Sequence, residues 1–189
     1  MKQNKMLGVA LAGVMAMSML AFQAEAKTVK VTLHAQEVDL PIDNKGTMYR
    51  TWTFDGKVPG PLVRVTEGDT VDFTLINDKS NKNSHSMDFH AARLDVVSDF
   101  GPIKPGEEKH FTFDATFPGV FFYHCGSDPM LQHIARGMFG AIIVDPKDAG
   151  AMPKADREYV LVQSELYPNP DSKEDMMQNK WSNVMFNGG

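Results

Sequence analysis

Four of the six histidines and the single cysteine of the 189-residue chain fall in two short windows, residues 85–90 and 123–138. A thiol, two imidazoles and a thioether among them form the ligand set of a blue copper site, in which soft sulfur ligands favour copper and a weak axial thioether tunes the potential. The four candidate ligands are His85, Cys125, His133 and Met138. The spacing Cys125-x7-His133-x4-Met138 allows one loop to supply three of them, so we expect His85 to arrive from a distant strand.

The alternation of side chains along extended strands indicates a second metal site, because neighbouring residues point to opposite faces. If Cys125 points inward to a blue copper, then His124 points outward, and one peptide joins the two faces. His85 and His90 are five apart and would also face opposite ways, whereas Asp88 and His90 are two apart and share a face. His90 and His124, with Asp88 beside them, are therefore candidates for a second, outer metal site. Two bonded neighbours that each hold a metal would form a short covalent path for electrons.

Each of these residues also has an ordinary structural interpretation. A lone buried cysteine usually acts as a small hydrophobic residue, and a methionine such as Met138 often fills a core. His90 and His124 could be surface or interface histidines, and His34 and His110 are expected to be surface residues of other strands. Four correct ligand types in order, on a β-rich background, favour the metal sites over these alternatives.

Short β-rich runs separated by Gly and Pro turns surround the two windows, and they indicate an all-β, two-sheet sandwich. The clearest run alternates, with Val71, Phe73 and Leu75 on one face. The expected strands are residues 27–33, 49–54, 70–77, a run around Phe111 and Phe113, 120–125, 140–144 and 158–165. The expected helices are short, at residues 128–135 and 171–180.

Composition and charge limit the classes of partner. With 19 Lys and Arg against 24 Asp and Glu, the formal net charge is -5. This argues against nucleic acid as the main partner, because phosphate binding needs a clustered cationic excess. Hydrophobic residues make up 42% of the chain, which is enough for a globular core and excludes wholesale disorder.

Residues 1–26 have the pattern of a secretory signal peptide. A start with two lysines precedes an uncharged, mostly apolar run over residues 6–22, and Ala24-Glu25-Ala26 supplies a small-x-small cleavage site. We predict cleavage before Lys27, export to the periplasm and no membrane span after cleavage. The alternative is an uncleaved membrane anchor, since the apolar run approaches spanning length. In that oxidising compartment a structural protein would normally pair its cysteines, so a single one needs a chemical reason.

The chain resembles the first cupredoxin domain of copper-containing nitrite reductases, in the form found in ammonia-oxidising bacteria. The likeness runs from about Lys27 to the C-terminus. Its motifs are Thr51-Trp-Thr-Phe-Asp-Gly-Lys-Val-Pro-Gly-Pro61, His85-x-x-Asp88-Phe-His90, Tyr123-His-Cys125 and Gly137-Met138. The resemblance implies a cupredoxin-like Greek-key β-sandwich over residues 27–147. Residues 148–189 would then be a short C-terminal extension, formed by a linker and the start of a truncated second cupredoxin domain.

The resemblance also implies an activity, the one-electron reduction of nitrite to nitric oxide. The type 1 copper would be held by His85, Cys125, His133 and Met138, and the catalytic type 2 copper by His90 and His124. Asp88 would deliver protons to bound nitrite, and electrons would cross from the type 1 copper through Cys125-His124 to the type 2 copper. A small donor such as a c-type cytochrome or a cupredoxin would supply them.

The resemblance implies a homotrimer as well. In that family the third type 2 histidine comes from the second domain of a neighbouring subunit, so we expect this chain to be a fragment or a naturally short form. Two other functions remain open. A single-domain blue-copper electron carrier needs only the first ligand set. A laccase-like two-domain multicopper oxidase would need His-x-His pairs, which this sequence lacks, and Gly126 rather than His follows Cys125.

Overall fold

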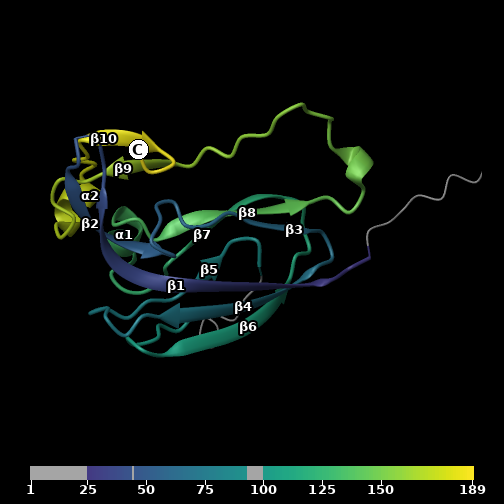
Figure 1. The fold of residues 1–189 in the computed structure, drawn as a ribbon, viewed down its shortest axis with the longest axis horizontal. Coiled ribbons are helices and arrows are strands. Elements are labelled where there is room, and N and C mark those ends of the chain that lie inside the picture. The colour runs from purple at the N-terminus through teal and green to yellow at the C-terminus, as the bar shows by residue number, and fades with distance from the viewer. Residues whose placement is uncertain (1–24, 44, 93–99) are drawn as a thin grey trace, which may run out of the picture.

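Two four-stranded β-sheets, packed face to face, form the body of the protein (Figure 1). The structure is a computed structural model that describes residues 25–43, 45–92 and 100–189. The predicted signal peptide, residues 1–26, lies outside the described residues except for its last two positions. Within the described ranges, no helix is long and apolar enough to cross a membrane.

The first sheet has the strand order β2-β1-β4-β6, and its strands are β1 Thr28–Pro41, β2 Met48–Phe54, β4 Thr70–Asn77 and β6 Glu108–Asp114. The strand β1 is longer than predicted because it changes partner along its length. From Thr28 to Ala35 it pairs in parallel with β4, and from Ala35 to Pro41 it pairs antiparallel with β2. The residues after Ala35 therefore leave β4 and lie beside the loop that follows it.

The strand β4 has the bounds and the alternation that the sequence predicts. Val71, Phe73 and Leu75 are buried, and the residues between them are partly exposed. Phe73 contacts Phe111 of its own sheet and Phe89 of the opposite sheet, with ring centroids 5.0 Å apart in both pairs. Tilted and edge-to-face aromatic pairs contribute about 0.5–1.5 kcal/mol beyond burial. These rings therefore hold the two sheets together at the centre of the core.

The second sheet has the strand order β3-β8-β7-β5, and its strands are β3 Val63–Thr66, β5 Asp88–Phe89, β7 Gly119–His124 and β8 Phe139–Asp145. The strands β3 and β5 are absent from the sequence prediction. They contain only four and two residues, which is too short for an alternating pattern to be recognised. The two-sheet sandwich itself is confirmed.

Tyr123 fixes the end of β7 from which the candidate ligands project. Its side chain is fully buried, and its hydroxyl donates a hydrogen bond of 2.6 Å to the carbonyl of Pro61. The ring lies against Gly140 of β8, where an added Cβ would stand 2.3 Å from Cζ of the tyrosine, and against Gly60, where it would stand 2.6 Å from the hydroxyl. Both glycines are therefore needed for the close approach of the backbone to this ring.

The C-terminal part of the chain runs from β8 through the short 3-10 helix η1, Ala149–Ala151, and returns to the end of the sandwich that carries α1, Met130–Ala135 (Figure 1). There it forms the hairpin of β9, Gln163–Leu166, and β10, Asn183–Phe186, with the helix α2, Lys173–Met177, between them. The strand predicted at residues 158–165 begins later, because only residues 163–166 pair with β10.

Polar contacts attach this segment to the sandwich. The hydroxyl of Tyr49 on β2 donates to the carbonyl of Tyr167 at 2.7 Å. Arg136, next to α1, forms an ion pair with Asp171, and Gln132 of α1 donates to the same carboxylate at 2.9 Å. The segment is therefore packed against the helix that carries His133.

Candidate metal centres

The first candidate centre is a buried cluster of His85, Cys125 and His133, whose ligand atoms all lie within 4.8 Å of one another. The sulfur of Cys125 is 3.2 Å from Nδ1 of His133 and 4.0 Å from Nδ1 of His85. The two Nδ1 atoms are 3.2 Å apart. The cysteine and both histidines are buried, so the cluster is closed to bulk solvent.

Each member of this inner cluster comes from a different element. Cys125 directly follows β7, and His133 lies on α1. His85 lies outside the named strands, contrary to the expectation of a strand, and forms an isolated bridge to Ile103. Met138 precedes β8 and is fully buried. Its carbonyl accepts from the N–H of Cys125 at 3.0 Å, and its N–H donates to the carbonyl of His133 at 3.1 Å, so backbone hydrogen bonds close the ligand loop at its base.

The second candidate centre is an outer cluster of Asp88, His90 and His124. The two Nε2 atoms are 3.0 Å apart, and Oδ2 of Asp88 is 3.5 Å from each. Asp88 pairs directly with His124 across β5 and β7, and the N–H of His90 donates to the carbonyl of Phe122 at 3.0 Å. The side chain of His90 is 49% exposed and that of His124 only 7%. One side of this cluster therefore opens to the surface.

The two clusters are joined by the peptide between His124 and Cys125. The ring of His124 also contacts the backbone of the next residue, because its Nδ1 lies 3.0 Å from the carbonyl oxygen of Cys125. A carbonyl only accepts hydrogen bonds, so Nδ1 carries the proton and Nε2 keeps a lone pair that faces His90. The backbone thus sets the tautomer that an Nε2 metal ligand requires.

Comparison with known proteins shows the family to which this arrangement belongs. A sequence model of the multicopper oxidases matches residues 36–149, the stretch that contains both clusters. The chain belongs to the multicopper oxidase family. Its homologues include copper-containing nitrite reductases. That of Neisseria meningitidis serogroup A is 42% identical over 142 residues, covering 74% of this chain and 36% of the relative. That of Rhizobium sullae is 40% identical over 160 residues, covering 78% and 41%. This multicopper oxidase domain therefore spans less than half of the length of these relatives.

Solved structures agree with this family. The copper nitrite reductase from Nitrosomonas europaea is 78% identical, with a TM-score of 0.84 over 86% of this chain and 57% of that chain. A structure described as a multicopper oxidase is 30% identical, with a TM-score of 0.73 over 85% and 54%. The likeness confirms the cupredoxin-like sandwich and the resemblance to copper-containing nitrite reductases. The laccase-like alternative is less well supported.

Burial sets the protonation states of the residues in the inner cluster. Burial raises the pKa of the Cys125 thiol, although hydrogen bonds from Ser127 and Ser86 oppose the change. Burial lowers the pKa of His133 to about 4, helped by the charge of His85, whose own pKa is also lowered by burial. Both imidazoles are therefore neutral at pH 7, with lone pairs available. A bound cation would supply the positive charge that a buried thiolate needs.

This donor set fits copper, the metal that the family implies. Two imidazole nitrogens and a cysteine sulfur converge, and a thioether residue is buried at the base of the same loop. Soft sulfur ligands combined with imidazole select copper over hard cations such as magnesium. The outer cluster offers imidazole nitrogens and a carboxylate, which also suit copper, and its exposed side leaves room for a substrate.

Asp88 has a raised pKa in the outer cluster. Burial is the main cause, and the charges of His124 and His90 oppose it. A carboxyl group that keeps its proton more readily than usual is suited to act as an acid toward a ligand held between the two histidines.

Several residues around the inner cluster are absent from the sequence prediction. Ser86 donates its backbone N–H to the sulfur of Cys125 at 3.3 Å. Trp52 packs edge-on against His133, with ring centroids 4.6 Å apart. Glu37 lies 3.4 Å from Nε2 of His85. The position of Ser86 next to His85 in the sequence could have indicated that it lies at the inner cluster. Trp52 and Glu37 are distant in sequence, and the pairing of β1 with β2 brings them to the cluster.

The two remaining histidines lie on the strands and at the surface, as predicted. His34 on β1 pairs with Asp78 at 2.9 Å, and His110 on β6 pairs with Asp72. Each side chain is about half exposed, and each belongs to the first sheet, whereas the ligands follow or flank the second. Neither belongs to a candidate metal cluster of the described chain.

Proposed function

We propose that this chain forms the electron-relay part, and one side of the catalytic site, of an enzyme that reduces nitrite to nitric oxide. The observation that carries the proposal is that His124 and Cys125, which are consecutive, belong to two separate clusters of metal-ligating side chains. An electron carrier needs one such cluster. A reductase needs a site that receives electrons and a second that binds substrate, with a short path between them.

In this proposal His85, Cys125, His133 and Met138 hold the type 1 copper, and His90 and His124 hold the type 2 copper. Copper at these positions supplies a one-electron couple and a Lewis acid that polarises nitrite. The inner residues exclude water from the thiolate, because they are fully buried. The covalent bond between Cys125 and His124 provides the electron path.

Asp88 is the proposed proton donor. The reaction consumes one electron and two protons: nitrite becomes nitric oxide, and the oxygen that leaves departs as water. Oδ2 of Asp88 stands 3.5 Å from both Nε2 atoms, so a proton on this oxygen is close to any ligand held between His90 and His124. General acid catalysis of this kind contributes about 10²–10⁴-fold to a rate.

The number of ligands in the outer cluster bears on the oligomeric state of the protein. The described chain offers two imidazoles there, whereas catalytic metal sites commonly have three protein ligands. We propose that the third comes from the second cupredoxin domain of a neighbouring subunit, in a homotrimer of the full-length protein. We also propose that residues 27–147 are the cupredoxin domain, and that residues 148–189 are a linker and the start of a second one.

The proposed location is the periplasm, reached by means of the signal peptide at residues 1–26. The expected electron donor is a small c-type cytochrome or a cupredoxin, and the process served is denitrification. The amino-terminal pattern of residues 1–26 and the nitrite reductase homologues support these assignments.

Copper content and nitrite turnover test the proposal. In the full-length protein that contains this chain we expect two coppers per chain and nitric oxide from nitrite with a reduced donor. His90→Ala should lose one copper and the turnover while keeping the intense thiolate-to-copper absorption, and Cys125→Ser should lose that absorption.

The second candidate function is a blue-copper electron carrier, favoured by the convergence of His85, Cys125 and His133 within one chain. One copper per chain of the full-length wild-type protein, redox-active but without nitrite turnover, would support the carrier and contradict the reductase.

A further inference from the structure

A buried carboxylate lies on the far side of the His85 ring from the cysteine. Glu37 follows the change of partner in β1, and its side chain is only 2% exposed. Its Oε1 accepts hydrogen bonds from the backbone N–H of Lys82 at 3.0 Å and of Asn83 at 2.8 Å, and from Nδ2 of Asn83 at 3.0 Å. Three N–H donors favour the ionised form of this group. A charge this deeply buried is costly unless it is well paired, so its place beside a candidate ligand calls for a reason.

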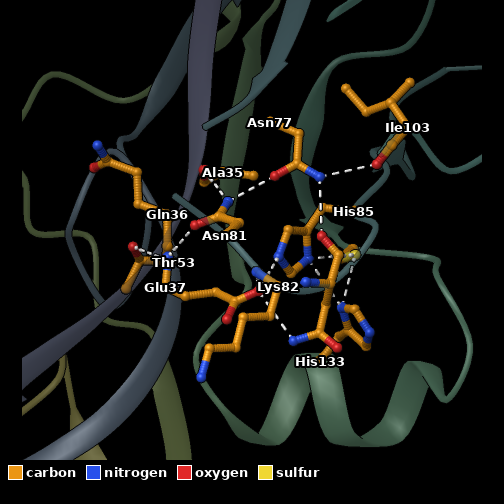
Figure 2. Close-up of polar contacts among 12 residues, drawn as sticks. Ala35, Gln36, Glu37, Thr53, Asn77, Asn81, Lys82, His85, Ile103 and His133 are labelled. Carbon is orange, nitrogen blue, oxygen red and sulfur yellow. Dashed lines mark hydrogen bonds and ion pairs between the residues drawn. The ribbon is translucent and has the colours of Figure 1, made fainter. Parts of the chain in front are cut away.

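Two buried asparagines tie the loop that leads to His85 to the strand that carries Glu37 (Figure 2). Oδ1 of Asn81 accepts from the N–H of Glu37 at 2.9 Å, and its Nδ2 donates to the carbonyl of Ala35 at 2.7 Å and to Oδ1 of Asn77 at 2.6 Å. Nδ2 of Asn77 donates to the carbonyls of Asn83 at 3.0 Å and Ile103 at 2.9 Å. A buried network in which these polar groups are satisfied rigidifies its surroundings.

The backbone of His85 is held by the same network. Its N–H donates to the carbonyl of Ile103 at 3.1 Å, and its carbonyl accepts from the N–H of Ile103 at 2.8 Å. With the backbone of His85 fixed in this way, only the side-chain torsion angles decide where its imidazole ring points. Nδ1 faces Cys125 and His133, while Nε2 is buried and lacks a full hydrogen bond among the described residues. The carboxylate oxygen Oε1 of Glu37 lies 3.4 Å from Nε2.

We propose that Glu37 is a positioning residue for the type 1 copper site. Its carboxylate attracts the Nε2 proton of His85 and so holds the ring with Nδ1 toward Cys125. It also places a negative charge behind the ligand, which favours Cu(II) over Cu(I). Metal-bound histidines commonly donate their second N–H to such a partner, and the loss of the partner costs about 10- to 100-fold in metal affinity or activity. This inference rests on the proposed role of His85 as a ligand.

A purely structural role is the competing explanation, because the same oxygen closes the loop at Lys82 and Asn83. Glu37→Gln separates the two. The amide keeps an acceptor oxygen and nearly the same volume, so the loop contacts survive, but the charge is lost.

Asp39→Asn is the matched control. Asp39 lies on the same strand, and its carboxylate is 3.6 Å from Arg50, the same guanidinium that stands 3.9 Å from Glu37. Its side chain is 55% exposed, so it faces solvent rather than the inner cluster. Both variants remove one negative charge from β1, and only one of them removes it beside His85.

The first measurement is the reduction potential of the type 1 copper in the copper-loaded protein. In Glu37→Gln we expect the thiolate-to-copper absorption to persist and the affinity for Cu(II) relative to Cu(I) to fall about tenfold. For a one-electron couple this is a rise of about 59 mV. We expect the potential of Asp39→Asn to equal that of the wild type.

The second measurement needs no copper. In the copper-free protein, nitrogen-15 NMR should show a proton on Nε2 of His85 that exchanges slowly with solvent in the wild type and in Asp39→Asn. The exchange should be faster in Glu37→Gln, because a neutral amide is a weaker acceptor than a carboxylate.

Equal potentials and equal proton exchange in all three proteins would overturn the inference, and nitrite reduction by the wild type would then leave the proposed function standing. A wild-type protein that binds copper without the thiolate-to-copper absorption would overturn the type 1 assignment and the inference with it. The two failures are therefore distinguished by the wild-type spectrum.

Discussion

The backbone N–H of Ser86 points at the sulfur of Cys125 across 3.3 Å, and the hydroxyl of the same serine accepts the N–H of Gly126 at 3.0 Å. One residue thus contacts the ligand sulfur and the first peptide of the ligand loop. Ser127 adds a hydroxyl contact to Ser86 at 3.2 Å. The loop is closed at this end by a serine that immediately follows the candidate ligand His85.

Ser86→Ala should destabilise the copper-free protein by about 1–3 kcal/mol, because the N–H of Gly126 loses its acceptor in a largely buried place. The thiolate-to-copper absorption should survive, since the backbone N–H of residue 86 remains. Urea unfolding followed by circular dichroism measures the change, with Ser80→Ala at an exposed position as control. Equal stability of the two variants would show that the hydroxyl contributes little.

Asp88→Asn should keep both coppers and lose about 100-fold or more of nitrite turnover, because the amide cannot donate an acidic proton. Burial raises the pKa of Asp88, so turnover in the wild type should fall as pH rises through that pKa and the carboxyl loses its proton. Steady-state rates across pH, together with copper analysis of each variant, test both statements. Full activity of Asp88→Asn at any pH would exclude the proton-donor role.

Alkaline pH should destabilise the protein through Tyr49. Burial raises the pKa of this phenol to about 12, helped by Asp171 and opposed by Arg136, from the ordinary value of 10.0. Because the folded-state pKa is the higher one, the stabilisation is complete below pH 10 and is lost as pH rises from 10 toward 12. Tyr49→Phe removes this contribution, so its unfolding free energy should decline less steeply in that range. Parallel curves for variant and wild type would contradict the assignment.

Gly140→Ala should destabilise the fold by about 1–3 kcal/mol or more, since overpacking in a dense core forces side chains from their rotamers. The added Cβ would stand 2.3 Å from Cζ of Tyr123, whose hydroxyl is already engaged with Pro61. Gly189→Ala is the control, because nothing lies within 4 Å of its would-be Cβ. Thermal unfolding of both variants gives the comparison, and similar midpoints would mean that the ring can move.

The features of the fold that depend on neighbouring residues were predictable from the sequence. The strand β4 follows from its alternation, and the grouping of Asp88, His90 and His124 follows from the side-chain parity of adjacent strands. The position of His85 was less predictable, because its one strand-like contact among the described residues is the bridge to Ile103, which lies beyond the next strand in the chain.

Glu37 shows why the rest could not be predicted. It is 48 residues from His85 in the chain, and the two meet only because β1 changes its partner at Ala35. The apolar alternation of β1 changes phase there, from odd-numbered positions up to Ala35 to Val38 and Leu40, but the sequence does not say which strand each half pairs with. Contacts of this kind depend on register between distant strands, which a single sequence leaves open.

The change of partner of β1 at Ala35 has a consequence for the order in which the protein folds and binds metal. The pairing of Thr28–Ala35 with β4 closes a chain segment of about forty residues in parallel, and such closures are slow compared with hairpin formation. Glu37, in the second half of β1, cannot approach the loop that leads to His85 until β1 has paired with both β4 and β2. Stable metal uptake at the inner cluster should therefore be a late event of folding, and the rate at which the thiolate-to-copper absorption appears would report completion of the whole sandwich rather than of any one hairpin.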